Sequence, residues 1–155
     1  MSWLTSWDSR RAPRTTRFTA DTAKILVVDD APMNLDVITG LLKRTKIYVD
    51  TADSGEECIR KFGLETYDLV FLDHRMPNMD GIETLQNMRK LYGDDLKGVP
   101  VISLTANAVA GAREQYIEAG FCDYLTKPVM VDELEEMLRK YLPKEKIVAQ
   151  TGEAV

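Results

Sequence analysis

The sequence of 155 residues has few cysteines, a single histidine and no long apolar run. Its two cysteines, Cys58 and Cys122, have neither the spacing of a zinc site nor that of a disulfide framework, so we expect reduced, structural thiols. No apolar stretch approaches the roughly 20 residues that a membrane span requires, and no secretory signal opens the sequence. We therefore expect a soluble, cytoplasmic domain without membrane contact.

Positive charge is also scarce. The 20 basic residues stand against 25 acidic ones, which gives a net charge of −5 and a pI near 5.0. A protein that grips nucleic acid needs a basic face against the phosphates, so direct nucleic-acid binding is disfavoured. Glycine-rich nucleotide loops of the Walker or dinucleotide type are missing as well, which makes ATP an unexpected phosphoryl donor.

The length predicts one domain with a core large enough to fold without staples. We place this domain at residues 24–142, between an N-terminal segment, 1–23, and a C-terminal tail, 143–155. The N-terminal segment is rich in serine, threonine and arginine and has no sustained hydrophobic period, which predicts a flexible tail or linker. A segment that docks through Trp3 and Trp7 is the alternative. The C-terminal tail is too short for a DNA-binding output domain.

From Lys24 onward, short apolar runs alternate with stretches of helical period. The expected strands cover residues 25–28, 47–51, 69–72, 99–104 and 121–125. The expected helices cover residues 32–44, 55–64, 82–88, 106–119 and 132–141, the last one capped by Asp132. Wholly apolar strands such as 25–28 are typical of strands buried on both faces. This alternation predicts an α/β fold with a doubly wound five-stranded parallel sheet and helices on both faces.

In such a fold the functional site lies at the carboxyl ends of the strands. Asp29 and Asp30 end the first predicted strand, and Asp73 ends the third. Thr105 follows the fourth strand and Lys127 follows the fifth. A single aspartate at a strand end is more often a helix cap or turn residue than a catalyst. Five such residues at four strand ends of one sheet are hard to explain by turn preferences.

These residue types indicate a particular chemistry. Three carboxylates crowded at one rim need a counter-charge, and Mg²⁺ binds through one or two carboxylates together with phosphate oxygens. Lys127 adds a compact positive charge, and Thr105 adds a hydroxyl donor for a phosphoryl oxygen. The pattern indicates Mg²⁺-dependent phosphoryl transfer to a carboxylate, for which aspartyl phosphate is a known class of intermediate.

Four motifs place most of the chain close to a known family. They are Val27-Val28-Asp29-Asp30, DHRMPNMDG at residues 73–81, Leu104-Thr105-Ala106, and YLTKP at residues 124–128. With these motifs the chain resembles the receiver domain of two-component response regulators, and it looks most like the receivers of hybrid sensor histidine kinases. The resemblance implies a flavodoxin-like sheet of strand order 2-1-3-4-5.

The resemblance implies a role for each acid at the rim. Asp73 would accept the phosphoryl group from a phosphohistidine on a histidine kinase or a histidine phosphotransfer domain. Asp30 and Asp73 would bind Mg²⁺ directly, and Asp29 would act largely through water. The backbone carbonyl of Arg75 would complete the protein ligands.

Other positions that match the family would contact the phosphoryl oxygens or act as the switch. Thr105, the amide of Ala106 and Lys127 would each contact the phosphoryl group. Tyr124 would be the aromatic switch residue that turns inward as Thr105 moves toward that group. Pro128 would follow a cis peptide bond.

Several further residues have both a functional and an ordinary interpretation. The resemblance implies that Arg75 and Asn107 tune how fast water removes the phosphoryl group. Met33 and Val37 lie at the edge of the first helix, where family members dock phosphotransfer helices, although ordinary packing explains either residue equally well. His74 is isolated from any ligand set, so we expect no catalytic or metal role for it.

Two other functions compete with a phosphoacceptor domain that is not itself an enzyme. An aspartyl hydrolase of the haloacid dehalogenase type would need a second aspartate two residues after Asp73, where this chain has Arg75. A binding module with dispensable phosphorylation would lack some of the site residues, and none is missing. The sequence favours the phosphoacceptor.

Overall fold

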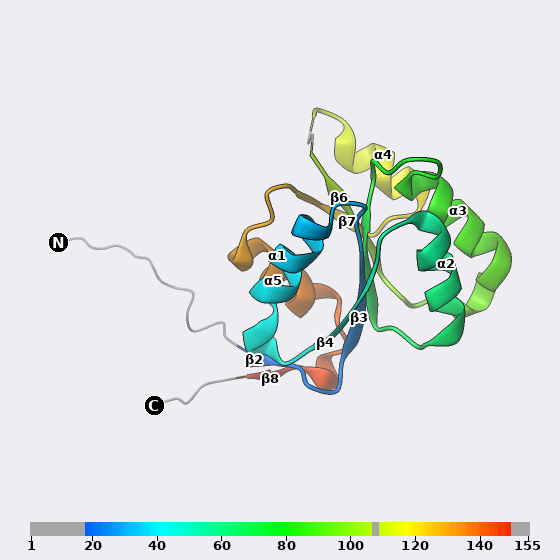
Figure 1. Ribbon diagram of the computed structural model, residues 1–155. Helices are drawn as coiled ribbons and strands as arrows, with labels where there is room; N and C mark the ends of the chain where they lie inside the picture. Colours follow the sequence, from blue (N-terminus) through cyan, green and yellow to red (C-terminus); the bar gives the residue numbers. More distant parts are fainter. Residues whose placement is uncertain (1–17, 107–108, 150–155) are drawn as a thin grey trace.

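The computed structural model describes residues 18–106 and 109–149, and within these ranges a five-stranded parallel sheet lies between two layers of helices (Figure 1). The strands of this sheet are β3 (Lys24–Val28), β4 (Tyr48–Ala52), β5 (Leu69–Asp73), β6 (Val101–Thr105) and β7 (Asp123–Thr126). The α-helices are α1 (Pro32–Leu41), α2 (Gly55–Leu64), α3 (Gly81–Tyr92), α4 (Ala112–Ala119) and α5 (Val131–Tyr141). Short 3₁₀ helices are η2 (Lys43–Thr45), η3 (Gly93–Asp95) and η4 (Lys144–Lys146). None of the helices in the described ranges is long and apolar enough to cross a membrane.

The strands lie in the order β4-β3-β5-β6-β7, and every neighbouring pair is parallel. Numbered along the chain, this is the order 2-1-3-4-5, so the predicted doubly wound sheet is confirmed. The order reverses between β3 and β5, and the carboxyl ends of both strands therefore border one crevice at the edge of the sheet.

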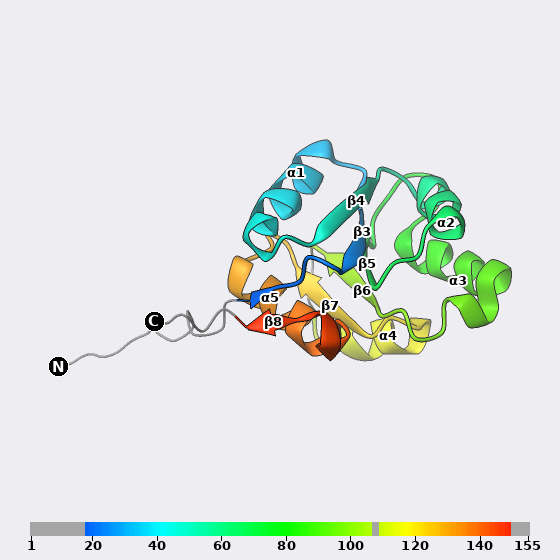
Figure 2. The ribbon, with the colours of Figure 1, turned by 90° about the horizontal axis from the view of Figure 1, so that it is seen from below.

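Apolar residues on both faces of the strands account for the two layers of helices. Ile25 and Val27 of β3 are fully buried on the face that packs with Ile38 of α1. Leu26 and Val28 are buried on the opposite face, which α2, α3 and α4 cover. Figures 1 and 2 show α1 and α5 on one side of the sheet and the other three helices on the other side.

The first helix is shorter than predicted. The sequence suggested residues 32–44, but α1 ends at Leu41 and continues into the 3₁₀ turn η2. The buried Thr45 donates from both its amide (3.0 Å) and its hydroxyl (2.5 Å) to the carbonyl of Leu42. Lys46 then takes a left-handed conformation, with φ 62°. The local hydrogen bonds of Thr45 tighten the chain and end the α-helix.

The second half of the chain also departs from the predicted bounds. The fourth helix begins at Ala112 instead of residue 106, because Gly111 precedes it in a left-handed conformation with φ 85°. The last helix begins at Val131 after Met130, so Asp132 lies in its first turn and does not cap it. The strands predicted at 99–104 and 121–125 run instead from 101 to 105 and from 123 to 126.

A second, two-stranded sheet lies outside the predicted domain limits. Strand β2 (Phe18–Thr19) pairs antiparallel with β8 (Val148–Ala149), and Phe18 packs into the core on the side of α1 and α5 with 3% of its surface exposed. The amide of Ala20 donates to the carbonyl of Thr45 at 2.7 Å. Figure 2 shows β2 and β8 side by side.

The limits of 24 and 142 are therefore too narrow. Residues 18–23 belong to the fold because they contribute buried side chains, and residues 143–149 lead to the paired strand β8. The rest of the segment predicted as a flexible tail, including Trp3 and Trp7, lies outside the described residues.

Candidate functional site

The three predicted carboxylates meet at one edge of the sheet. Asp29 and Asp30 follow β3, and Asp73 is the last residue of the neighbouring strand β5. One carboxylate oxygen from each residue lies within 4.8 Å of the others. Asp29 and Asp73 are buried, whereas Asp30 is exposed to solvent. The parallel pairing of β3 and β5 thus assembles the acidic cluster that the sequence predicted.

Lys127 closes the acidic cluster from the side of β7. Its Nζ lies 2.8 Å from Oδ2 of Asp29 and 3.0 Å from Oδ1 of Asp73. Its backbone amide donates to the carbonyl of Thr105 at 2.8 Å, which fixes the residue beside the end of β6. The bond from Lys127 to Pro128 is cis, as expected. The ammonium group therefore bridges two of the three acids.

The electrostatics of the cluster leave negative charge uncompensated. Burial raises the pKa of Asp73 to about 6, and the nearby charges of Asp29 and Asp30 act in the same direction against the hydrogen bond from Lys127. Burial lowers the pKa of Lys127, but its hydrogen bonds to Asp29 and Asp73 outweigh this and raise it overall. A cluster of carboxylate oxygens with this excess charge fits a hard divalent cation such as Mg²⁺.

Asp29 is held more tightly than the sequence indicated. Its Oδ1 accepts a hydrogen bond from the amide of Ala31 at 2.9 Å. Its Oδ2 accepts one from Nδ2 of Asn34 at 3.2 Å and also contacts Lys127. Sequence reasoning missed Asn34, since a polar residue in the first turn of a helix looks like an ordinary solvated position.

The loop after Asp73 is shaped by close backbone packing. A Cβ atom on Gly81 would lie 2.4 Å from the carbonyl oxygen of Asp73, and the amide of Gly81 donates to the carbonyl of His74 at 2.8 Å. Asn78 adopts a left-handed conformation with φ 71°, and the side chain of Asp80 caps α3. Only glycine fits at position 81 without moving the backbone of Asp73.

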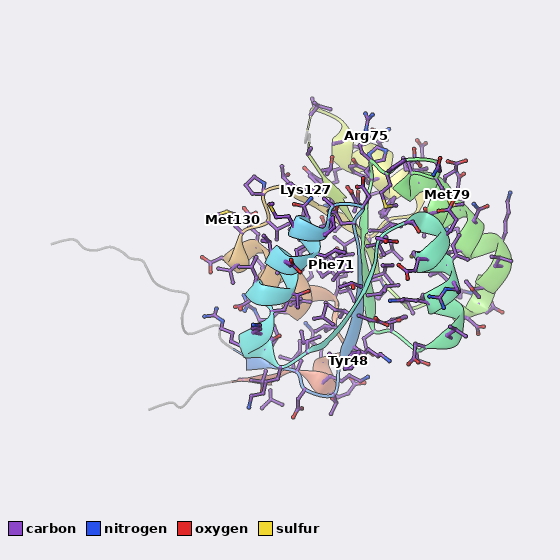
Figure 3. All side chains as sticks on the ribbon, viewed as in Figure 1. Tyr48, Phe71, Arg75, Met79, Lys127 and Met130 are labelled. Carbon is purple, nitrogen blue, oxygen red and sulfur yellow. The ribbon has the colours of Figure 1, made fainter. Side chains whose placement is uncertain are left out.

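The predicted phosphoryl-binding and tuning residues surround this cluster. Thr105 is buried at the end of β6, the strand next to β5, and Ala106 follows it at the surface. Arg75 is exposed, and Figure 3 shows it at the same end of the molecule as Lys127. Asn107 lies outside the described residues.

Tyr124 lies on β7, half-buried, and faces helix α4 rather than the acids. Its ring packs against Tyr116 of α4, with 5.8 Å between the ring centroids. Tyr116 is hydrogen-bonded to His74, the residue after β5. The sequence did not predict a partner for His74, because nothing in the local pattern links positions 74 and 116.

The proposed docking residues of α1 are at the surface. Met33 is 76% exposed and Val37 is 48% exposed. Met130, in the segment before α5, is 57% exposed and was missed by sequence reasoning. Figure 3 shows Met130 on the side of the molecule where α1 and α5 lie.

Comparison with known proteins agrees with the geometry. The family model described as the response regulator receiver domain matches residues 25–139. The signal transduction histidine-protein kinase BarA of Escherichia coli strain K12 is 36% identical over 119 residues, which are 77% of this chain and 13% of BarA. The chain thus spans only a small part of the length of the curated relatives that it matches.

Solved structures of other proteins are also similar to this chain. The receiver domain of sensor histidine kinase PA1611 from Pseudomonas aeruginosa PAO1, which has a magnesium ion coordinated in its active-site cleft, is similar with a TM-score of 0.69 and 34% identity. That match covers 77% of this chain and 96% of the PA1611 chain. Chemotaxis protein CheY4 of Vibrio cholerae has a TM-score of 0.71 and 27% identity, with 77% and 98% covered.

Proposed function

The chain belongs to the response regulator receiver domain family of two-component and phosphorelay signalling, and on that basis we propose that Asp73 is its phosphoacceptor. The observation that carries this proposal is the cluster at the carboxyl ends of β3, β5 and β7. There Asp73 lies within reach of two further carboxylates and 3.0 Å from the ammonium group of Lys127. No second aspartate stands at position 75, so the hydrolase alternative lacks its general acid.

The transfer forms one bond and breaks one. A carboxylate oxygen of Asp73 attacks the phosphorus of a phosphohistidine, the phosphorus–nitrogen bond breaks, and the imidazole nitrogen keeps the electron pair. Lys127 stabilises the negative charge on the phosphoryl oxygens, and the hydroxyl of Thr105 and the amide of Ala106 donate hydrogen bonds to them. The product is an acyl phosphate on Asp73.

A divalent cation fits the remaining charge. Asp29, Asp30 and Asp73 would hold Mg²⁺ together with the backbone carbonyl of Arg75. The hydrogen bonds of Asp29 with Ala31 and Asn34 support a role for this acid through water. When bound, Mg²⁺ neutralises the charge of the carboxylates and of the phosphoryl oxygens.

The phosphodonor comes from another protein or domain. His74 is the only histidine of this sequence, and its Nδ1 is engaged by the hydroxyl of Tyr116. The donor would therefore be a histidine kinase or a histidine phosphotransfer domain, in keeping with relatives that are sensor kinases. The exposed Met33, Val37 and Met130 offer the apolar surface on which such a donor would dock.

Phosphorylation would act as a switch. Thr105 would move toward the phosphoryl group, and Tyr124 would turn inward over β6, which changes the surface of α4, β7 and α5.

Arg75 and Asn107 would then set how long the acyl phosphate survives, as this site also hydrolyses its own phosphoryl group. The decay rate of phosphorylated Arg75→Ala tests that role, because an unchanged rate removes it.

The acceptor is tested with acetyl phosphate and intact-mass measurement, with and without Mg²⁺. We expect one Mg²⁺-dependent phosphoryl adduct that Asp73→Asn does not form. If no adduct appears, beryllofluoride binding separates a short-lived adduct from an inert site. A chain that neither forms an adduct nor binds beryllofluoride is not a phosphoacceptor.

A further inference from the structure

The lone histidine is part of an aromatic contact that the phosphotransfer chemistry does not use. The hydroxyl of Tyr116 lies 2.7 Å from Nδ1 of His74, and the two rings meet edge to face with 5.3 Å between centroids. Tyr116 is 2% exposed and, with Ala112, is one of two buried residues of α4. The side chain of Tyr116 thus links helix α4 to the residue that follows β5.

Tyr116 also contacts Phe121, which precedes β7, and Tyr124 of β7. Its ring centroid is 5.7 Å from that of Phe121, edge to face, and 5.8 Å from that of Tyr124. One ring thus touches both the residue next to the acceptor and the predicted switch residue.

The backbone of His74 is held in place by two hydrogen bonds. Its backbone amide donates to the carbonyl of Leu104 at 2.9 Å, and its carbonyl accepts from Gly81 at 2.8 Å. Both hydrogen bonds attach His74 to elements that flank Asp73. A shift of α4 relative to β5 consequently changes the distance between His74 and Tyr116 rather than the position of His74.

The layer beneath α4 also contains an unsatisfied polar group. Ser103 lies opposite Tyr124 in the register of β6 and β7, and its hydroxyl is buried with no hydrogen-bond partner among the described residues. A buried hydroxyl without a partner costs free energy. Ser103 therefore places a polar side chain beside Tyr124 in the layer beneath α4.

Building on the proposed phosphorylation of Asp73, we propose that Tyr116 is a positioning residue whose hydrogen bond to His74 holds the ring of Tyr124 in the arrangement seen here. The ring of Tyr116 packs against that of Tyr124, so a turn of Tyr124 toward Thr105 changes the contact between the two rings. The hydrogen bond opposes this turn, so it sets how readily phosphorylation of Asp73 changes the surface of α4 and β7.

Tyr116→Phe in the full chain tests the proposal, since it keeps the ring contacts and removes only the hydroxyl. Beryllofluoride with Mg²⁺ serves as the probe of the activated arrangement. One hydrogen bond shifts an equilibrium about 2- to 12-fold, so the apparent dissociation constant for beryllofluoride should fall by up to that factor. Ring resonances of ¹³C-labelled Tyr124 should also move toward their beryllofluoride positions before the probe is added.

Tyr92→Phe is the matched control. The hydroxyl of Tyr92 in α3 donates to the carbonyl of Ile59 in α2 at 2.6 Å, so this bond does not involve α4. We expect this variant to lose stability while its beryllofluoride affinity stays that of the parent chain. If Tyr116→Phe behaves like Tyr92→Phe, the tyrosine is only a structural anchor and the proposal is wrong.

A double-mutant cycle with His74→Leu identifies the partner. If the hydroxyl acts through His74, the double variant should bind beryllofluoride no more tightly than either single variant. Additive effects would overturn the assignment of this pair. A parent chain that binds no beryllofluoride and forms no phosphoryl adduct would instead overturn the proposed function, and the inference with it.

Discussion

Among the described carboxylates with a shifted pKa, Asp73 is the one whose pKa is raised. Burial and two neighbouring acids raise its pKa to about 6 from an ordinary 3.8, although Lys127 lies 3.0 Å away. Asp123, also buried, shows the opposite balance. Burial raises its pKa, but hydrogen bonds from the amide of Tyr124 and the hydroxyl of Tyr141, with the charge of Arg113, outweigh this and lower it. The negative charge concentrated around Asp73 therefore costs stability as long as no cation compensates it.

The raised pKa of Asp73 predicts a stabilising substitution. In Mg²⁺-free buffer the ionised carboxylate of Asp73 lowers the free energy of unfolding above pH 6. This cost vanishes below pH 3.8, where Asp73 is protonated in both the folded and the unfolded chain. Asp73→Asn should therefore raise the free energy of unfolding by about 1 to 3 kcal/mol at pH 8, and by less as the pH falls through 6. Urea unfolding with a chelator at several pH values measures this.

Asp123→Asn is the control of opposite sign for that experiment. Because the pKa of Asp123 is lowered in the folded chain, its contribution to stability is present above pH 3.8 and is lost as the pH falls further. The variant should be less stable than the parent at pH 8. Equal effects of the two substitutions would contradict the charge balance described for Asp73.

The close approach of Gly81 to Asp73 predicts a steric effect of any larger side chain at position 81. A methyl group at this position would collide with the carbonyl of Asp73 at 2.4 Å, so the backbone must shift. Gly81→Ala should lose about 1 to 3 kcal/mol of stability and slow phosphorylation by acetyl phosphate. Gly40→Ala in α1, where a Cβ meets nothing within 4 Å, should gain up to about 1 kcal/mol. Unfolding curves and adduct formation rates, measured side by side, distinguish the two.

Among the helices, α1 both contacts the acidic cluster and presents the surface proposed for docking. Asn34 of α1 bonds Asp29, while Met33 and Val37 of the same helix point their apolar side chains into solvent. One short element thus positions an acid and presents a surface beside it. This arrangement explains why a docking helix would lie within reach of Asp73.

Val37→Asp separates docking from chemistry. It should slow transfer from a histidine phosphotransfer protein that phosphorylates the parent chain by about 5- to 30-fold, the effect of losing about 1 to 2 kcal/mol of docking free energy. Phosphorylation by acetyl phosphate should stay the same, because Val37 is no part of the acidic cluster. Leu91→Asp, at an exposed apolar position of α3, is the matched control. Equal transfer rates in the two variants would place the donor elsewhere.

For the molecule as a whole, strands β2 and β8 lie at the opposite end of the five-stranded sheet from the acidic cluster (Figure 1). The pair joins residues 18–19 to residues 148–149, and Lys146, just before β8, forms a salt bridge to Asp68 at 2.8 Å.

Phe18→Ala measures how much β2 contributes to the free energy of unfolding. Removing a buried phenylalanine side chain costs about 3 to 5 kcal/mol in a core, and we expect a loss near the lower limit at this peripheral site. Adduct formation with acetyl phosphate should be unchanged in chains that remain folded. Val148→Ala, at an exposed position of β8, should change stability by less than about 0.5 kcal/mol. A Phe18→Ala chain as stable as the parent would show that β2 adds nothing.

Much of this architecture was readable from local patterns. Apolar runs such as the one at Ile25–Val28 predict strands buried on both faces, and the aspartates that end these runs predict the acidic rim. These predictions succeed because a parallel sheet brings the carboxyl ends of its strands to one edge whatever the lengths of the connecting segments. Helix ends were less predictable: Thr45 and Gly111 end or delay helices through hydrogen bonds and backbone angles that leave little trace in a hydrophobic pattern.

The contacts between distant residues depended on the assembled fold. The bond between His74 and Tyr116, the bond from Asn34 to Asp29, and the pairing of Phe18 with Ala149 each join residues whose neighbours in the sequence give no sign of a partner. Periodicity reports which face of an element is buried, but not which side chain it meets there. The order of residues along the chain thus prescribed the sheet and the acids at its rim. Packing of the helices on that sheet selected the partners that hold those acids and the aromatic rings around them.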